Sequence, residues 1–174
     1  MSTPTDTDFD IRPATAAPAL LHEIVDGEWV ERESSGAQSS FIARQIFRAL
    51  DAHVATHGLG QVVQKRRPNV AFVSVDRLPP GQPIPAEGDL EFAPDLAIEV
   101  LSPKDRDRDV DRKLREYFQA GATRVWVVRP GRRTIAVHRS PTRLYAHEEH
   151  EEVDCDPEIP GRRLRVGSVF PPFA

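Results

Sequence analysis

Residues 94–121 read PDLAIEVLSPKDRDRDVDRKLREYFQAG and combine an apolar strand with an amphipathic helix. The run from Pro94 to Leu101 is too apolar for a half-exposed strand, so we expect a central strand that is covered on both faces. A helix should follow from about Asp105 to Ala120, because its apolar residues recur at helical spacing and form one buried stripe. Gly121 should end this helix.

The flanking sequence predicts the other elements of a mixed sheet. A hairpin is expected around Asp26-Gly27, a pair that favours a tight turn. Apolar residues at every fourth position predict a helix from about Ser39 to His57, followed by Gly58. We also expect strands at Gln61–Lys65, Val70–Val75, Arg124–Arg129 and Thr134–His138, a long loop at Asp76–Glu91, at best a weak strand in the acidic stretch up to Glu158, and an apolar tail at 159–174 that docks. This order predicts an α/β fold in which a mixed sheet packs against helices.

A length of 174 residues suits one well-buried core. We expect residues 1–18, which carry three aspartates and no apolar run, to be a mobile tail rather than a signal peptide, and residues 19–174 to be a single domain. No apolar run approaches the roughly 18 residues that a membrane span needs. The lone Cys155 excludes an internal disulfide, so a cytoplasmic location is the default expectation.

The charge distribution argues against tight, nonspecific binding to nucleic acid. The net charge is −4, although the acids are concentrated between Ser140 and Glu158, where seven acidic residues stand against one arginine. Weak or transient binding to a polyanion stays open. The arginines of the second helix alternate with aspartates and favour a salt-bridged helix face over a phosphate-binding one; they are Arg106, Arg108, Arg112 and Arg115.

Several common sites lack their motifs. The chain contains no G-x-G-x-x-G, no G-x-x-x-x-G-K-[ST], no G-x-S-x-G and no H-E-x-x-H. His147, His150 and Cys155 lie near one another in the sequence, but the acidic stretch around them shows no pattern that would hold a metal.

Glu99 is the most informative residue, because a carboxylate in the middle of an apolar strand is costly to desolvate unless a cation pairs with it. Lys113 can supply that cation, since it lies at the margin of the helix stripe that faces the sheet. Two readings remain open at this stage: a structural ion pair, or a divalent-metal site in which the lysine assists an attacking water.

A metal site would need a second ligand, and geometry restricts the choice. Asp95 points to the same face as Glu99, but four strand residues separate their Cα atoms by about 13 Å. Either a bulge near Pro94 brings Asp95 inward, or the ligand comes from the neighbouring strand, where Asn69 offers a carbonyl oxygen without a charge.

The quoted residues resemble the Uma-two family of endonucleases, in the PD-(D/E)XK, restriction-endonuclease-like superfamily. PDLAIEVLSP, then Lys113, Tyr117 and Gly121 in the pattern K-x-x-x-Y-x-x-x-G, and the strand WVVRP carry the likeness. The resemblance implies a restriction-endonuclease-like core that hydrolyses DNA phosphodiester bonds with Mg²⁺ or Mn²⁺. It matches Asp95, Glu99 and Lys113 to the site, and Glu23 to a carboxylate of the hairpin. Cutting both strands needs two sites, which is compatible with a homodimer.

Two positions depart from the family pattern. Asn69 stands where the family has an aspartate, and Ser39 lies near the usual place of a histidine. A neutral ligand at position 69 should weaken Mg²⁺ binding, so reduced nuclease activity is expected unless Asp95 or Glu23 compensates. The alternative from another class is a catalytically silent binding or dimerisation module that keeps the fold.

Overall fold

The computed structural model describes residues 20–25, 28–33, 36–65, 67–81 and 93–172. Contacts divide the chain into two units, 1–35 and 36–174, which we describe separately. The first unit contains strands β1 (Leu20–Val25) and β2 (Glu28–Glu33), which pair antiparallel. This pairing confirms the two strands of the expected hairpin. Asp26-Gly27, the side chain of Glu23 and the tail at 1–18 lie outside the described residues.

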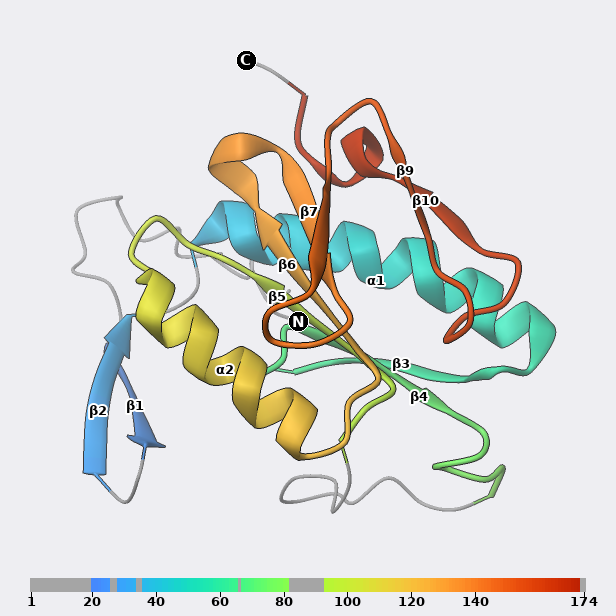
Figure 1. The fold of residues 1–174 in the computed structure, drawn as a ribbon, viewed down its shortest axis with the longest axis horizontal. Helices are drawn as coiled ribbons and strands as arrows, with labels where there is room; N and C mark the ends of the chain where they lie inside the picture. Colours follow the sequence, from blue (N-terminus) through green and yellow to red (C-terminus); the bar gives the residue numbers. More distant parts are fainter. Residues whose placement is uncertain (1–19, 26–27, 34–35, 66, 82–92, 173–174) are drawn as a thin grey trace, which may run out of the picture. The chain divides into compact units, whose positions relative to one another are not determined.

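The second unit is built on a six-stranded mixed sheet with the order β3-β4-β5-β6-β7-β8 (Figure 1). Its central pair, β5 and β6, is parallel, and the other neighbours are antiparallel. A separate antiparallel pair is formed by β9 and β10. The strands are β3 (Gly60–Gln64), β4 (Val70–Ser74), β5 (Leu96–Val100), β6 (Arg124–Arg129), β7 (Thr134–His138), β8 (Leu144–His147), β9 (Glu152–Asp154) and β10 (Arg163–Arg165).

Two helices pack on opposite faces of this sheet (Figure 1). Helix α1 (Ala37–His57) buries the predicted four-residue repeat against Ile98 and Trp126. Helix α2 (Asp107–Gln119) buries Val110 and Leu114 against the other face. All five residues of β5 are buried, which confirms the expectation of a central strand covered on both faces.

The helix ends follow from their sequences. Gly58 ends α1 in the left-handed conformation, with φ 61°, and its N–H donates to the Ala55 carbonyl. Asp107 and Asp109 occupy the first turn of α2, where carboxylates interact favourably with the helix dipole. Gly121, with φ 102°, follows α2 as expected.

The carboxyl-terminal third contains more strands than the sequence indicated. Residues 144–147 form β8 at the sheet edge, and residues 152–154 and 163–165 form the β9–β10 pair. The expectation of at most one weak strand in the acidic stretch was too low, because β8 is held by backbone pairing to β7 and carries no apolar alternation that would reveal it. The tail docks as expected: Val166, Val169 and Phe170 are buried, and Val166–Val169 forms a short 3-10 helix.

Gly60 provides a test of the join between α1 and the sheet. Its φ of 149° and its place opposite Ser74 would put an added Cβ 2.8 Å from the Ser74 Cα and in direct collision with the Val73 carbonyl oxygen. We expect Gly60→Ala to lower the free energy of unfolding by about 3 kcal/mol, because the backbone must shift. Gly131→Ala is the matched control, since an added Cβ there meets no atom within 4 Å. Equal urea-unfolding curves for the two variants would contradict this account.

Candidate active site

Glu99 lies at the centre of the α2-facing side of the sheet. It alternates with Ile98 and Val100, whose side chains face α1, so strand geometry directs its carboxylate towards α2. The Glu99 side chain is only 6% exposed. A carboxylate at this depth requires polar partners.

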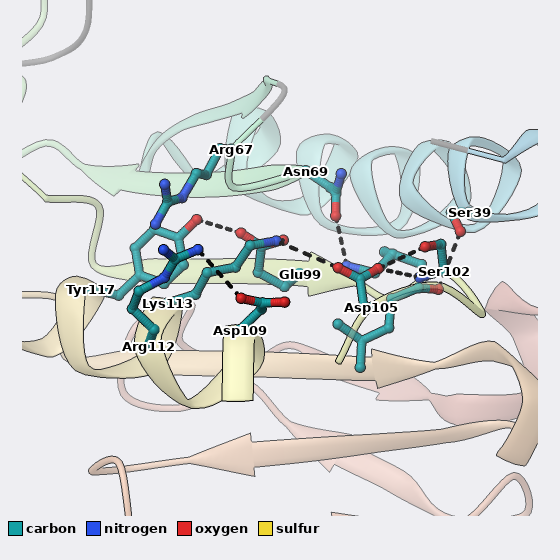
Figure 2. Close-up of polar contacts among 12 residues, drawn as sticks. Ser39, Arg67, Asn69, Glu99, Ser102, Asp105, Asp109, Arg112, Lys113 and Tyr117 are labelled. Atoms are coloured by element: carbon teal, nitrogen blue, oxygen red, sulfur yellow. Dashed lines mark hydrogen bonds and ion pairs between the residues drawn. The ribbon is translucent and has the colours of Figure 1, made fainter. Parts of the chain in front are cut away.

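Two side chains of α2 supply those partners (Figure 2). The Lys113 Nζ lies 3.2 Å from the Glu99 Oε2, and the Tyr117 hydroxyl donates to Oε1. Lys113 and Tyr117 are four residues apart and therefore project from the same face of the helix. The expected contact between Glu99 and Lys113 is confirmed. The role of Tyr117 was missed, because its spacing fitted the apolar stripe equally well.

Tyr117 acts as a donor that does not ionise. Its burial, followed by the negative charge of Glu99 and the hydrogen bond to it, raises the pKa of the phenol far above its usual range. The hydroxyl proton therefore stays on Tyr117 and keeps one Glu99 oxygen in place.

Beyond Tyr117, charged side chains tie α2 to the segment before β4. Arg67 forms an ion pair with Glu116 and also lowers the Tyr117 pKa, in opposition to Glu99. Arg112 lies 3.8 Å from the other Glu116 oxygen and 3.6 Å from Asp109. These contacts are partly exposed, so we assign them a positioning role rather than a large contribution to stability.

Asn69 stands across from Glu99. The last pair of the β4–β5 ladder is Val70 with Ile98, and one further step of this antiparallel register places Asn69 opposite Glu99. The Asn69 Oδ1 accepts a hydrogen bond of 2.7 Å from the Val100 N–H. The amide oxygen that could have faced an ion is therefore engaged by the backbone of β5.

Asp105 is the second carboxylate of the cluster. Its Oδ1 lies 4.0 Å from the Lys113 Nζ, on the approach to α2 (Figure 2). Its Oδ2 accepts from the backbone N–H and the hydroxyl of Ser102, at 2.7 and 2.8 Å. Sequence reasoning placed Asp105 on a salt-bridged helix face. The sequence did contain a signal for Asp105. Ser102 lies just after the carboxyl end of the buried strand, and an aspartate three residues later can accept hydrogen bonds from it.

Asp95 is not part of this cluster. Its Oδ1 lies 2.9 Å from the Arg77 Nε, and its Oδ2 accepts from the Ser74 N–H at 2.7 Å. The structure thus does not bring Asp95 to Glu99, because Arg77 and the Ser74 N–H hold its carboxylate elsewhere. Because β5 is a regular strand, the four-residue separation puts the Cα atoms of Asp95 and Glu99 about 13 Å apart.

Ser39 and Glu23 are the two remaining positions that the family resemblance singled out. Ser39 is buried at the start of α1, and its hydroxyl donates to the Leu101 carbonyl at 3.2 Å. It therefore joins α1 to the end of β5. Glu23 belongs to the first unit, and its side chain lies outside the described residues.

Two carboxylates near Lys113, those of Glu99 and Asp105, are the oxygen donors from which a divalent-cation site would be built. Within the described part of the chain, no group of three or more His, Cys, Asp or Glu side chains is arranged to hold a metal. Mg²⁺ binds carboxylate oxygens and is commonly held by one or two of them together with waters. Glu99 and Asp105, both adjacent to Lys113, are donors of this kind. The chemistry of these side chains therefore fits a magnesium ion.

A family model described as "Uma2: Putative restriction endonuclease" matches residues 7–167. The chain belongs to the Uma2 family. The family expected from PDLAIEVLSP, Lys113 and Tyr117 is thereby confirmed, and a nuclease-like function is supported.

A solved structure is similar to this Uma2 protein over most of both chains. It is described as a putative nuclease belonging to DUF820 from Anabaena variabilis ATCC 29413. The TM-score is 0.73 and the identity 17%, with 86% of this chain and 89% of that chain covered. This likeness confirms the expected restriction-endonuclease-like core. No functionally curated protein matches the sequence.

The described part of the chain contains two α-helices, α1 and α2. Neither has both the length and the apolar character that crossing a bilayer requires.

The Tyr117–Glu99 hydrogen bond can be tested by removing one oxygen atom. We expect Tyr117→Phe to lower the free energy of unfolding by about 1–3 kcal/mol, because a buried carboxylate oxygen loses its donor. Tyr145→Phe is the matched control: Tyr145 is exposed, and its hydroxyl lies 3.4 Å from Glu151. Chemical denaturation measures both. A loss at Tyr117 no greater than that at Tyr145 would contradict the assignment.

Proposed function

We propose that this Uma2 protein is a metal-dependent endonuclease that hydrolyses DNA phosphodiester bonds at the Glu99–Lys113 cluster. The observation that carries the proposal is the buried Glu99 carboxylate in contact with the Lys113 ammonium, in a chain of a restriction endonuclease family. Such paired and buried ionisable groups are costly to maintain and are frequent at catalytic sites.

Each side chain has a defined task in this proposal. Glu99 and Asp105 would hold Mg²⁺ or Mn²⁺, which when bound supplies Lewis acidity and an activated water. Lys113 positions the nucleophile and stabilises the negative charge that develops on the phosphate. Tyr117 holds the Glu99 carboxylate in one orientation. Asp95 and Asn69, the other metal ligands expected from the sequence, support β4 and β5 through their hydrogen bonds.

With asparagine at position 69, the cluster binds a metal more weakly than it would with aspartate there. It faces Glu99 across the β4–β5 pair and contributes no charge. A hard divalent cation gains most from charged oxygen ligands, so the exchange of aspartate for asparagine costs affinity. We therefore propose a nuclease of low metal affinity.

DNA would be approached by cations along α2 and immediately before it. Arg106, Arg108 and Arg115 are exposed, and the described residues provide none of them with an ion pair. The expected salt-bridged face is thus restricted to Arg112, whose partners are Asp109 and Glu116. With a net charge of −4, few phosphate contacts are available, and we propose weak or transient DNA binding. Double-strand cleavage would use a homodimer, as two sites are then needed.

A second candidate function is the silent module that keeps the fold without cleavage. Both Glu99 oxygens are already engaged by Lys113 and Tyr117. The pocket that these three side chains line with apolar residues of α2 and β6 has no room for a water molecule. In this alternative the ion pair is structural, and the role of the protein is binding or dimerisation.

Plasmid nicking with Mg²⁺ or Mn²⁺ separates the two candidates. We expect the wild type to nick supercoiled DNA slowly, and Lys113→Met to lower the rate at least about 100-fold, because the developing charge loses its cation. Asn69→Asp should raise the rate about tenfold at limiting Mg²⁺, because a charged ligand is restored. Absence of nicking by both the wild type and Asn69→Asp would favour the silent module. Activity that appears only in Asn69→Asp would identify a nuclease that has lost its metal.

A pair of carboxylate variants identifies the second acidic ligand. We expect Mn²⁺ to raise the melting temperature of the wild type, since a ligand that binds only the folded state stabilises it. Asp105→Asn should remove this rise, and Asp95→Asn should leave it while lowering the melting temperature through loss of the Arg77 ion pair. The reverse pattern would show that Asp95, rather than Asp105, works with Glu99.

A further inference from the structure

Three arginines lie abreast on the α1-facing side of the sheet. The register pairs Trp126 with Val137 and Val137 with Tyr145 across β6, β7 and β8. Extending this register by two residues, backward along β6 and β8 and forward along β7, aligns Arg124, Arg139 and Arg143. The Arg139 N–H donates to the Arg143 carbonyl at 2.9 Å. Like charges opposite one another on neighbouring strands are destabilising, so this row needs negative partners.

Only one of the three arginines has such a partner among the described residues. Arg124 is 5% exposed at the side chain and pairs with Glu158, with 3.0 Å between Nε and Oε2. Its Nη1 donates to the Asp154 carbonyl at 3.3 Å. Arg139 and Arg143 are exposed and form no ion pair with the part of the chain that the structure describes. Two guanidinium groups therefore remain available to an anion.

A pocket of about 350 Å³ adjoins these arginines. Volumes of roughly 300–1,000 Å³ are typical of small-molecule sites. Strands β6, β7, β8 and β9 contribute to its lining, and the turn between β7 and β8 contributes Arg139 and Arg143. The strand residues of the lining are Arg124, Val137, Leu144, Tyr145, His147 and Asp154. Strand alternation places it on the face opposite Glu99, whose neighbours Val127 and Ala136 face α2. The pocket is thus separate from the proposed catalytic cluster.

An aromatic ring completes the pocket. Tyr145 is 60% exposed, and its ring lies nearly perpendicular to that of His147, with centroids 4.7 Å apart at an interplanar angle of 76°. An exposed ring next to two unpaired arginines provides a stacking surface beside a phosphate-binding fork. Asp154 is the acid in the lining, and its Oδ1 accepts a hydrogen bond of 3.0 Å from the Asp156 N–H. Glu158 pairs with Arg124, so neither Arg139 nor Arg143 has an acidic partner in the described part of the chain.

We infer that this pocket binds a nucleoside monophosphate unit, with its phosphate on Arg139 and Arg143 and its base stacked on Tyr145. Guanidinium groups bind phosphate oxygens in pairs, which suits a terminal phosphate better than a single carboxylate. The unit can be a free nucleotide or the 5′-phosphorylated end of a DNA strand. The site is additional to the Glu99 cluster and does not depend on its activity.

Isothermal titration calorimetry of the full chain with AMP, adenosine and inorganic phosphate tests the inference. We expect AMP to bind with one site per chain. Adenosine and inorganic phosphate should each bind with an affinity at least about tenfold lower than that of AMP. Tyr145→Leu should reduce the affinity for AMP and leave that for inorganic phosphate unchanged. Equal affinities for AMP and inorganic phosphate, or no heat with millimolar AMP, would overturn the proposal.

Charge variants show whether the arginine row is the site. The double variant Arg139→Gln, Arg143→Gln should weaken AMP binding about tenfold or more, because charge-assisted hydrogen bonds are lost. The control is Arg44→Gln, Arg132→Gln, which removes the same charge from exposed positions on α1 and on the turn after β6. Equal affinities of the two double variants would refute the site. Melting temperatures establish that both variants fold.

Two further titrations show whether the ligand is a free nucleotide or a DNA end, and whether this site is independent of the Glu99 cluster. A short 5′-phosphorylated oligodeoxyadenylate that binds more tightly than AMP assigns the pocket to DNA ends, and the opposite order assigns it to free nucleotides. Glu99→Gln should bind AMP as the wild type does, whatever its nicking rate. Loss of AMP binding in Glu99→Gln would overturn the separation of the two sites.

Discussion

The buried Glu99 carboxylate is the group on which the arrangement of β5 and α2 depends. Its two oxygens must be compensated where water has little access, and both compensating groups, the Lys113 ammonium and the Tyr117 hydroxyl, come from one face of α2. This requirement selects the rotation of the helix about its axis. Val110 and Leu114 then face the sheet, so the polar contacts and the apolar packing specify the same placement of α2.

The same carboxylate connects the surrounding segments. Asn69 stands opposite it and binds the next backbone N–H of β5, and Asp105 approaches Lys113 from the turn before α2. Ser39 fastens α1 to the carbonyl of Leu101. The cluster is therefore formed where the end of the central strand meets both helices and the start of the neighbouring strand. A site at this junction is held by rigid elements, which is what precise positioning of a phosphodiester would require.

Strand alternation gives the sheet two chemically different faces. Glu99 and its partners lie on the face under α2, whereas Arg124, Arg139 and Arg143 lie on the other face, beside Tyr145. One face thus holds carboxylates balanced by a lysine, and the other holds arginines that outnumber their described acidic partners. The net charge of −4 does not reveal this difference, because the acidic residues of the carboxyl-terminal third cancel the positive charge of these arginines.

Local patterns were sufficient for the strand and helix assignments around residues 94–121, for the helix at 37–57 and for the Glu99–Lys113 contact, because period-two and period-3.6 repeats report which side of an element is buried. The family followed from the same residues. Only the tertiary structure showed that Asp105 lies beside Lys113 and that Asp95 instead pairs with Arg77. It also showed that the Tyr117 hydroxyl contacts Glu99 and that three arginines are aligned across the sheet. These contacts depend on strand register and on partners distant in sequence. The edge strand β8 escaped prediction for the same reason: backbone pairing to β7 holds it, and backbone hydrogen bonds leave no mark in the side-chain pattern.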